Sequence, residues 1–249
     1  SFDISTSPIP FRLTMRSGGG QPRTGAPVGA GGSGPVVVAV VLGLGLSDDL
    51  SDSLAEAVLV DAAGEVGVAG HGILETRQLQ AGGVMAVGKH FPGIGRTILD
   101  SHLDLPTFRE DLEAMAPIEL PPFRAAIEHR VAGIMLSHIR YTGIDPVWPA
   151  SLSPAITADL LRRKMGYDGV VITDDLDMGA IKPNHDIDTA IRQIMLSDVD
   201  IALICHKGPN IEIAYQEILD GLHRSPDTRA RGKASVERIM ALKMKYIPI

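Results

Sequence analysis

The sequence predicts an α/β protein with a parallel sheet, a TIM-type (β/α) barrel that is incomplete or irregular in its N-terminal part. Short apolar runs alternate with helical patterns from Val84 onward, and every run ends in ionisable residues. Such alternation is typical of parallel strands joined by right-handed crossovers. A doubly wound sheet gathers its ligand at one switch point, whereas a barrel builds its site from the carboxyl ends of several strands. The spread of ionisable residues therefore favours the barrel.

Four apolar runs are predicted to be strands buried on both faces: VMAVGKH (84–90), AGIMLSH (132–138), GVVITDD (169–175) and DIALICH (200–206). Helices are expected between them. Thr107 and Glu110 match a capping box, and Ser153-Pro154 matches the start of a second helix, which Gly166 ends. Further helical patterns cover residues 187–197, 210–223 and 230–243.

The first 78 residues differ in character from the rest. Residues 16–70 are rich in Gly, Ala, Val and Ser, and the stretch RSGGGQPRTGAPVGAGGSG is typical of a linker. We therefore divide the chain into an atypical segment, 1–78, and a barrel portion, 79–249. Within the first segment, residues 16–70 are expected to be a flexible insertion.

Composition limits the classes of function. The chain has 249 residues, 45% of them hydrophobic, and a net charge of −7, which argues against a nucleic-acid or anionic-membrane surface. The apolar run 35–46 falls short of the roughly 20 residues that span a bilayer. A single cysteine excludes an internal disulfide. We expect a cytoplasmic monomer.

Three groups of residues are candidates for chemistry. Asp174 ends a buried strand, where an ionised carboxylate is costly unless it has a partner or a function. Asp100 lies two residues from His102 and can orient that imidazole as a general acid/base, although an ordinary polar turn explains the tripeptide equally well. Lys89-His90 ends another strand and can bind sugar hydroxyls or a phosphate.

Two long motifs give the chain a family resemblance. KHFPGIGRTILDSHLDLP and GVVITDDLDMGAI resemble the signature segments of glycoside hydrolase family 3, in particular its bacterial β-N-acetylglucosaminidase branch, the NagZ type. The similarity covers about residues 79–249. It implies an exo-acting β-N-acetylglucosaminidase that acts on muropeptide-like saccharides in peptidoglycan recycling. No metal or organic cofactor is implied, and the expected partner is a small carbohydrate.

The resemblance also assigns roles. Asp174 matches the nucleophile that forms a covalent glycosyl-enzyme, His102 matches the acid/base that Asp100 assists, and Lys89 and His90 match residues that bind sugar hydroxyls. The implied reaction retains the anomeric configuration. A histidine acid/base departs from the pair of carboxylates that most retaining glycosidases use.

The N-terminal part departs from the family pattern, which includes an Asp-Gln-Glu-Gly-Gly segment that is absent here. One inserted C turns codons for Asp-Gln-Glu-Gly, GAT-CAG-GAG-GGG, into CGA-TCA-GGA-GGG, which reads Arg-Ser-Gly-Gly, the residues at 16–19. We hypothesise that the chain leaves the family's reading frame near Arg16 and rejoins it near Leu79. An out-of-frame Asp-Gln-Glu-Gly-Gly in the gene is the expected finding.

Other functions remain alternatives. A β-glucosidase belongs to the same superfamily. A metal-dependent TIM-barrel hydrolase would use His90, His138, His206 and Asp174, which all end strands, as zinc ligands, although no His-x-His or His-Glu-x-x-His spacing occurs. The third alternative is a sugar-binding remnant whose catalysis is impaired.

Overall fold

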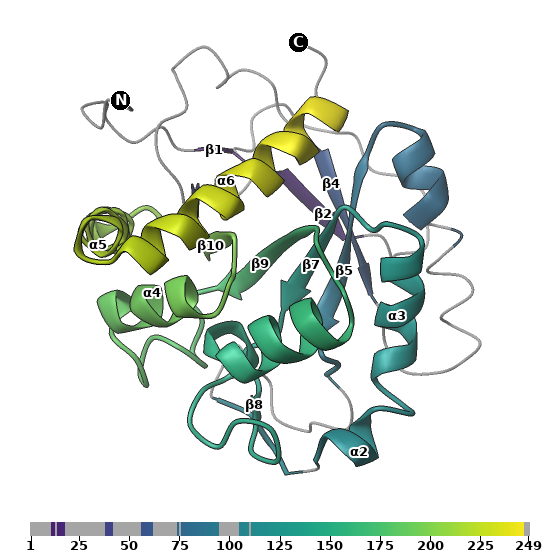
Figure 1. The fold of residues 1–249 in the computed structure, drawn as a ribbon, viewed down its shortest axis with the longest axis horizontal. Helices are drawn as coiled ribbons and strands as arrows, with labels where there is room; N and C mark the ends of the chain where they lie inside the picture. Colours follow the sequence, from purple (N-terminus) through teal and green to yellow (C-terminus); the bar gives the residue numbers. More distant parts are fainter. Residues whose placement is uncertain are drawn as a thin grey trace, which may run out of the picture.

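A computed structural model describes residues 11–12, 14–17, 38–41, 56–61, 74, 76–94, 105–109 and 111–246. Eight strands form one sheet, in the order β1-β3-β10-β9-β7-β5-β4-β2 (Figure 1). Their bounds are β1 (Phe11–Arg12), β2 (Thr14–Ser17), β3 (Val38–Val41), β4 (Glu56–Asp61), β5 (Met85–Phe91), β7 (Gly133–Leu136), β9 (Val170–Asp175) and β10 (Ile201–Ile204).

Six of these strands are parallel and follow one another in chain order, β2, β4, β5, β7, β9 and β10. This unbroken order is that of a (β/α) barrel and differs from a doubly wound sheet, in which the order reverses at a switch point. The sheet is open in the described residues, because β3 pairs antiparallel with β10 and β1 extends that edge. The prediction of an incomplete TIM-type barrel is confirmed.

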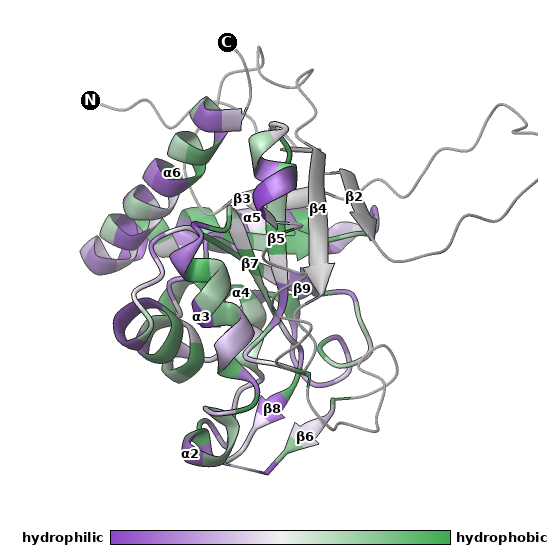
Figure 2. Cartoon of the chain, turned by 90° about the vertical axis from the view of Figure 1, so that its right-hand side faces the viewer, coloured by the Kyte–Doolittle hydropathy of each residue, from purple (hydrophilic) through white to green (hydrophobic). Residues whose placement is uncertain are grey.

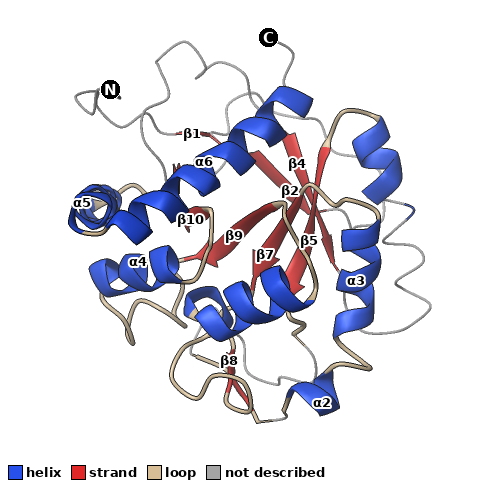
Figure 3. Cartoon of the chain, in the orientation of Figure 1, coloured by secondary structure: helices blue, strands red, loops and turns tan. Residues whose placement is uncertain are grey.

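The described helices are α2 (Leu112–Met115), α3 (Leu120–Glu128), the 3₁₀ helix η2 (Ala150–Leu152), the π-helix η3 (Ala155–Lys164), α4 (Ile187–Leu196), α5 (Pro209–Arg224) and α6 (Pro226–Tyr246). Residues 76–81 are also helical. Helices α3 and α4 lie beside the strands, and α6 crosses over them (Figure 3). None of the helices in the described ranges combines the length and apolarity that a membrane crossing requires.

Local signals explain one helix and mislead about another. The Ser153 hydroxyl accepts a hydrogen bond from the Ile156 amide at the start of η3, and Gly166, at φ +73°, ends it as predicted. The prediction that a capping box at Thr107 starts a helix is wrong. Thr107–Phe108 forms strand β6 and pairs with β8 (Arg140–Tyr141), and α2 begins later, at an Asp111 cap. Long-range strand pairing overrides the local pattern there.

Strands β5, β7, β9 and β10 bury both faces, as strands of a parallel sheet should. Ala86, Ile134 and Val171 lie on the face covered by the helices α3, η3, α4 and α5, whereas Met85 and Val87 lie on the other. Helix α6 presents Ile239 to that second face. Figure 2 shows hydrophobic and hydrophilic residues interspersed along α6.

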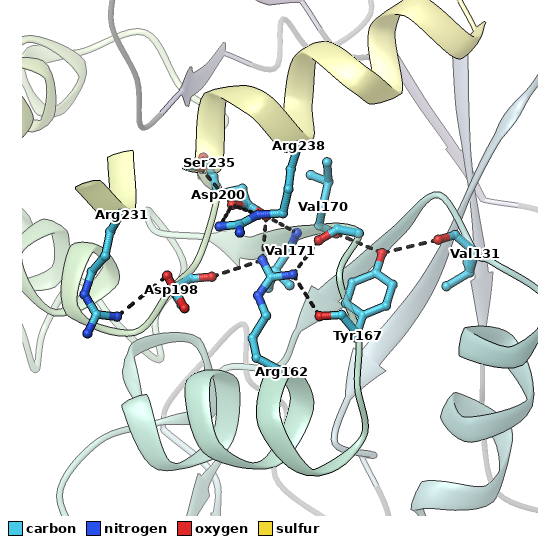
Figure 4. Close-up of polar contacts among 11 residues, drawn as sticks. Val131, Arg162, Tyr167, Val170, Val171, Asp198, Asp200, Arg231, Ser235 and Arg238 are labelled. Carbon is cyan, nitrogen blue, oxygen red and sulfur yellow. Dashed lines mark hydrogen bonds and ion pairs between the residues drawn. The ribbon is translucent and has the colours of Figure 1, made fainter. Parts of the chain in front are cut away.

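A buried charge cluster fastens α6 to the sheet (Figure 4). Asp200, fully buried before β10, pairs with Arg162 at 2.7 Å and with Arg238 at 2.8 Å. It also accepts hydrogen bonds from the Ser235 hydroxyl and the Val171 amide. Because it lies at the amino-terminal end of a strand, where barrels concentrate stability rather than chemistry, we interpret this cluster as structural.

Strands β1, β2, β3 and β4 come from the first 78 residues, and none of them was predicted from sequence. Residues 16–70 were expected to be a flexible insertion because they are rich in Gly, Ala, Val and Ser. The short runs at 38–41 and 56–61 nevertheless supply strands.

Candidate active site

The candidate site lies at the carboxyl ends of the parallel strands. His90 comes from β5 and Asp174 from β9, and the end of β7 lies between these two strands. The Nε2 atom of His90 is 3.3 Å from Oδ2 of Asp174, and about four-fifths of each side chain is buried. The structure thus brings together two residues that the sequence assigned to one site.

The carboxylate of Asp174 is held in its charged form. Burial disfavours the charge, but the hydrogen bond from His90 and the neighbouring imidazoles outweigh it and lower the pKa of Asp174 to about 2. The amide of Asp175 adds a hydrogen bond of 2.9 Å to Oδ1. A carboxylate that stays ionised near neutral pH is what a nucleophile at a glycosidic carbon requires.

His90 and Lys89 offer polar groups beside that carboxylate. Nε2 of His90 faces Asp174 and donates to it. Within the described part of the chain, the Nδ1 atom of His90 is buried and has no hydrogen-bond partner. A sugar hydroxyl, which can both donate and accept, is a suitable partner for this nitrogen. Lys89 is partly buried at the same strand end.

The turn after β5 brings the backbone close to a neighbouring helix. Gly93 has φ +138°, and a Cβ there would collide with the Glu119 side chain. Only glycine fits this position without movement of its neighbours. The Tyr141 hydroxyl donates to the carbonyl oxygen of Gly93, which holds the turn against β8.

The four residues that the sequence offered as zinc ligands, His90, His138, His206 and Asp174, do not form a zinc site together. Both ring nitrogens of His138 are already engaged, Nδ1 with the Ser151 hydroxyl at 2.7 Å and Nε2 with the backbone carbonyl of Asp175 at 2.9 Å. His90 pairs with Asp174 instead. A buried histidine with two protein partners has no nitrogen left for a metal.

A different group of ligand types lies near the site, and the sequence analysis did not identify it. Single ligand atoms of Asp175, Asp177 and His206 all lie within 4.8 Å of one another. Both carboxylates also have hydrogen-bond partners among the described residues: Asp175 accepts from the Cys205 amide, and Asp177 accepts from the Asn210 amide nitrogen. The signals in the sequence were the second and third acids of the TDDLD stretch and His206, which follows its own strand.

Two of the assigned residues, Asp100 and His102, fall outside the described residues. Their assignment as acid/base and helper therefore stays a prediction from sequence. The described site contributes Asp174, His90 and Lys89.

Comparisons with known proteins agree with the architecture. Residues 66–242 match the glycosyl hydrolase family 3 N-terminal domain. The chain is 37% identical to a β-hexosaminidase of Alkalilimnicola ehrlichii over 138 residues, 55% of this chain and 39% of that protein. It is 33% identical to one of Methylococcus capsulatus over 165 residues, 64% of this chain and 49% of that protein.

A solved structure shows the same fold. It is a family 3 β-N-acetylglucosaminidase from Paenibacillus sp., superposed with a TM-score of 0.68 at 36% identity over 72% of this chain and 34% of that one. The chain thus spans less than half the length of these relatives. Since the domain match covers most of the chain and includes both strand ends of the site, the chain belongs to glycoside hydrolase family 3.

Proposed function

We propose that this chain is a retaining exo-β-N-acetylglucosaminidase. The observation that carries the proposal is the Asp174 carboxylate, ionised and held by His90 at the carboxyl end of a barrel strand. The relatives named β-hexosaminidase support the choice of an N-acetylhexosamine as the sugar. No cofactor takes part in the reaction.

The reaction proceeds by double displacement. An Asp174 oxygen attacks the anomeric carbon while His102, assisted by Asp100, gives its proton to the departing glycosidic oxygen. Water then attacks the same carbon, His102 takes the water's proton, and Asp174 leaves as a free carboxylate. Lys89 and Nδ1 of His90 bind sugar hydroxyls through both steps. Two inversions return the original anomeric configuration.

Hydrolysis of p-nitrophenyl N-acetyl-β-D-glucosaminide, followed by NMR, tests this proposal. The β-anomer of N-acetylglucosamine should form first, and the corresponding glucoside should react far more slowly. Asp174→Ala should lower kcat by about 10⁴-fold, whereas the control Asp159→Asn, whose side chain is 46% exposed, should not change it. An α-anomer as first product, or an active Asp174→Ala variant, would refute the proposal.

The natural substrate we propose is a muropeptide-like saccharide in the cytoplasm, during peptidoglycan recycling. The basis is the resemblance of the two signature motifs to the NagZ branch. Comparing kcat/KM for N-acetylglucosaminyl-anhydro-N-acetylmuramic acid with that for chitobiose tests the aglycone. A preference for chitobiose would contradict this choice.

A sugar-binding remnant is a second candidate. It is favoured by the sheet that stays open in the described residues and by the absent Asp-Gln-Glu-Gly-Gly segment. Thermal shift with N-acetylglucosamine beside the turnover assay separates the two. Stabilisation by the sugar without turnover would identify the remnant.

A further inference from the structure

His138 is a buried polar residue for which the proposed reaction has no role. It follows β7 and is 1% exposed. A carbonyl oxygen can only accept, so Nε2 of His138 must carry the hydrogen that bonds to Asp175, and Nδ1 must accept from Ser151. Burial lowers the pKa of His138 and favours this neutral form. The contacts therefore select one tautomer.

The carbonyl that His138 holds belongs to the residue after the nucleophile. The pairing of β9 with β10 shifts register between Ile172 and Asp175, and beyond the shift Asp175 pairs with Leu203. His138 binds the carbonyl of Asp175, and the amide of the same residue donates to Oδ1 of Asp174. The orientation of residue 175 thus sets the direction of the Asp174 carboxylate.

The residue before His138 holds the other half of the site. The amide of Ser137 donates to the carbonyl of Phe91 at 2.9 Å, next to His90. Its hydroxyl lies 3.1 Å from that of Tyr141, which in turn donates to Gly93. Two consecutive residues after β7 therefore hold the ends of both strands that supply the His90–Asp174 pair.

We propose that His138 is a positioning residue for the nucleophile: its Nε2–H, oriented by the Ser151 hydroxyl, fixes the end of β9 so that Asp174 faces His90 and the anomeric carbon. This inference rests on the proposed glycosidase function. His138 itself touches neither the sugar nor the water. Its effect passes through the backbone of Asp175.

Two substitutions of His138 show whether the residue positions Asp174 or only fills space. His138→Leu keeps the volume and removes the donor, and misplacement of a reacting group by about 1 Å is expected to lower kcat about 100-fold. KM should change little, because Lys89 and His90 still bind the sugar. His138→Gln carries an amide N–H that reaches the same carbonyl, and it should recover most of the lost kcat. The kcat of Ser151→Ala should lie between the values for His138→Leu and His138→Gln.

A core variant controls for loss of stability. Ile134→Ala removes buried volume from the same strand without touching the site, and should lower Tm with kcat unchanged. Equal losses of kcat in His138→Leu and His138→Gln would overturn the proposal. So would a wild-type kcat in His138→Leu, or a loss in Ile134→Ala as large as in His138→Leu.

A second measurement does not depend on turnover. In ¹⁵N-edited NMR spectra, the Nε2–H of His90 should show its hydrogen bond to Asp174 in the wild type and in His138→Gln, and should lose it in His138→Leu. An unchanged signal in all three would refute positioning. If the wild type hydrolyses no substrate, the proposed function fails by itself and this signal still decides the role of His138.

Discussion

Replacing His90 with leucine should change how stability depends on pH. In the wild type, the pKa of the Asp174 carboxyl lies at about 2 instead of its usual 3.8. This lowering corresponds to about 2.5 kcal/mol of stability when the carboxyl is fully ionised. Much of it comes from His90, 3.3 Å away, because burial alone would raise the pKa. We therefore expect His90→Leu to lose about 2 kcal/mol at pH 6.

The sign of the pH effect follows from the direction of the shift. A lowered carboxyl pKa stabilises the native state above the unfolded pKa, and this contribution disappears as pH falls through the folded pKa. The window is thus pH 4 to 2, and about half of the wild-type contribution should be gone by pH 3. Urea unfolding followed by circular dichroism at pH 6, 4 and 3 measures the difference between the two proteins.

The matched control is His223→Leu on the exposed side of α5. It should change stability by less than about 0.5 kcal/mol at every pH. A His90→Leu deficit that stays constant from pH 6 to pH 3 would refute the reasoning, because it would show that His90 packs beside Asp174 without stabilising its charge.

Three further substitutions or measurements test other parts of the structure. Asp200→Asn should cost about 3–5 kcal/mol and lower Tm by roughly 10 °C in a thermal melt, since Arg162 loses a buried partner; a change below about 1 kcal/mol would contradict the buried cluster. Tyr167→Phe removes a hydroxyl that donates to backbone carbonyls and should cost about 1 kcal/mol in urea unfolding. Burial and Asp175 raise the pKa of Cys205 to about 12, so iodoacetamide at pH 8 should label it slowly in the native protein and rapidly after unfolding, as mass spectrometry can measure.

Strands β5, β7, β9 and β10 and the helices from residue 154 onward could be predicted from sequence because each carries a local signal. All four predicted runs became strands β5, β7, β9 and β10, and the predicted helix at 187–197 is α4. The ionisable residues that end these strands share one edge, because the carboxyl ends of parallel strands meet there. This is how Asp174 and His90 could be assigned to one site before their distance was known.

Contacts between distant residues could not be predicted in the same way. The pairing of Thr107 with β8 depends on residues more than 30 positions away, so a local capping pattern gave the wrong element. The two partners of His138, Ser151 and Asp175, are likewise distant in sequence. A histidine that ends a strand looks the same in sequence whether it binds a ligand or the backbone of its neighbour.

Trapping the glycosyl-enzyme tests the central claim most directly. Incubation with an activated 2-deoxy-2-fluoro or related slow glycosyl donor, followed by digestion and mass spectrometry, identifies the residue that attacks the sugar. We predict one labelled peptide, spanning 170–175, with the sugar on Asp174. A label on any other residue, from a chain that turns over the substrate, would contradict the assignment of the nucleophile.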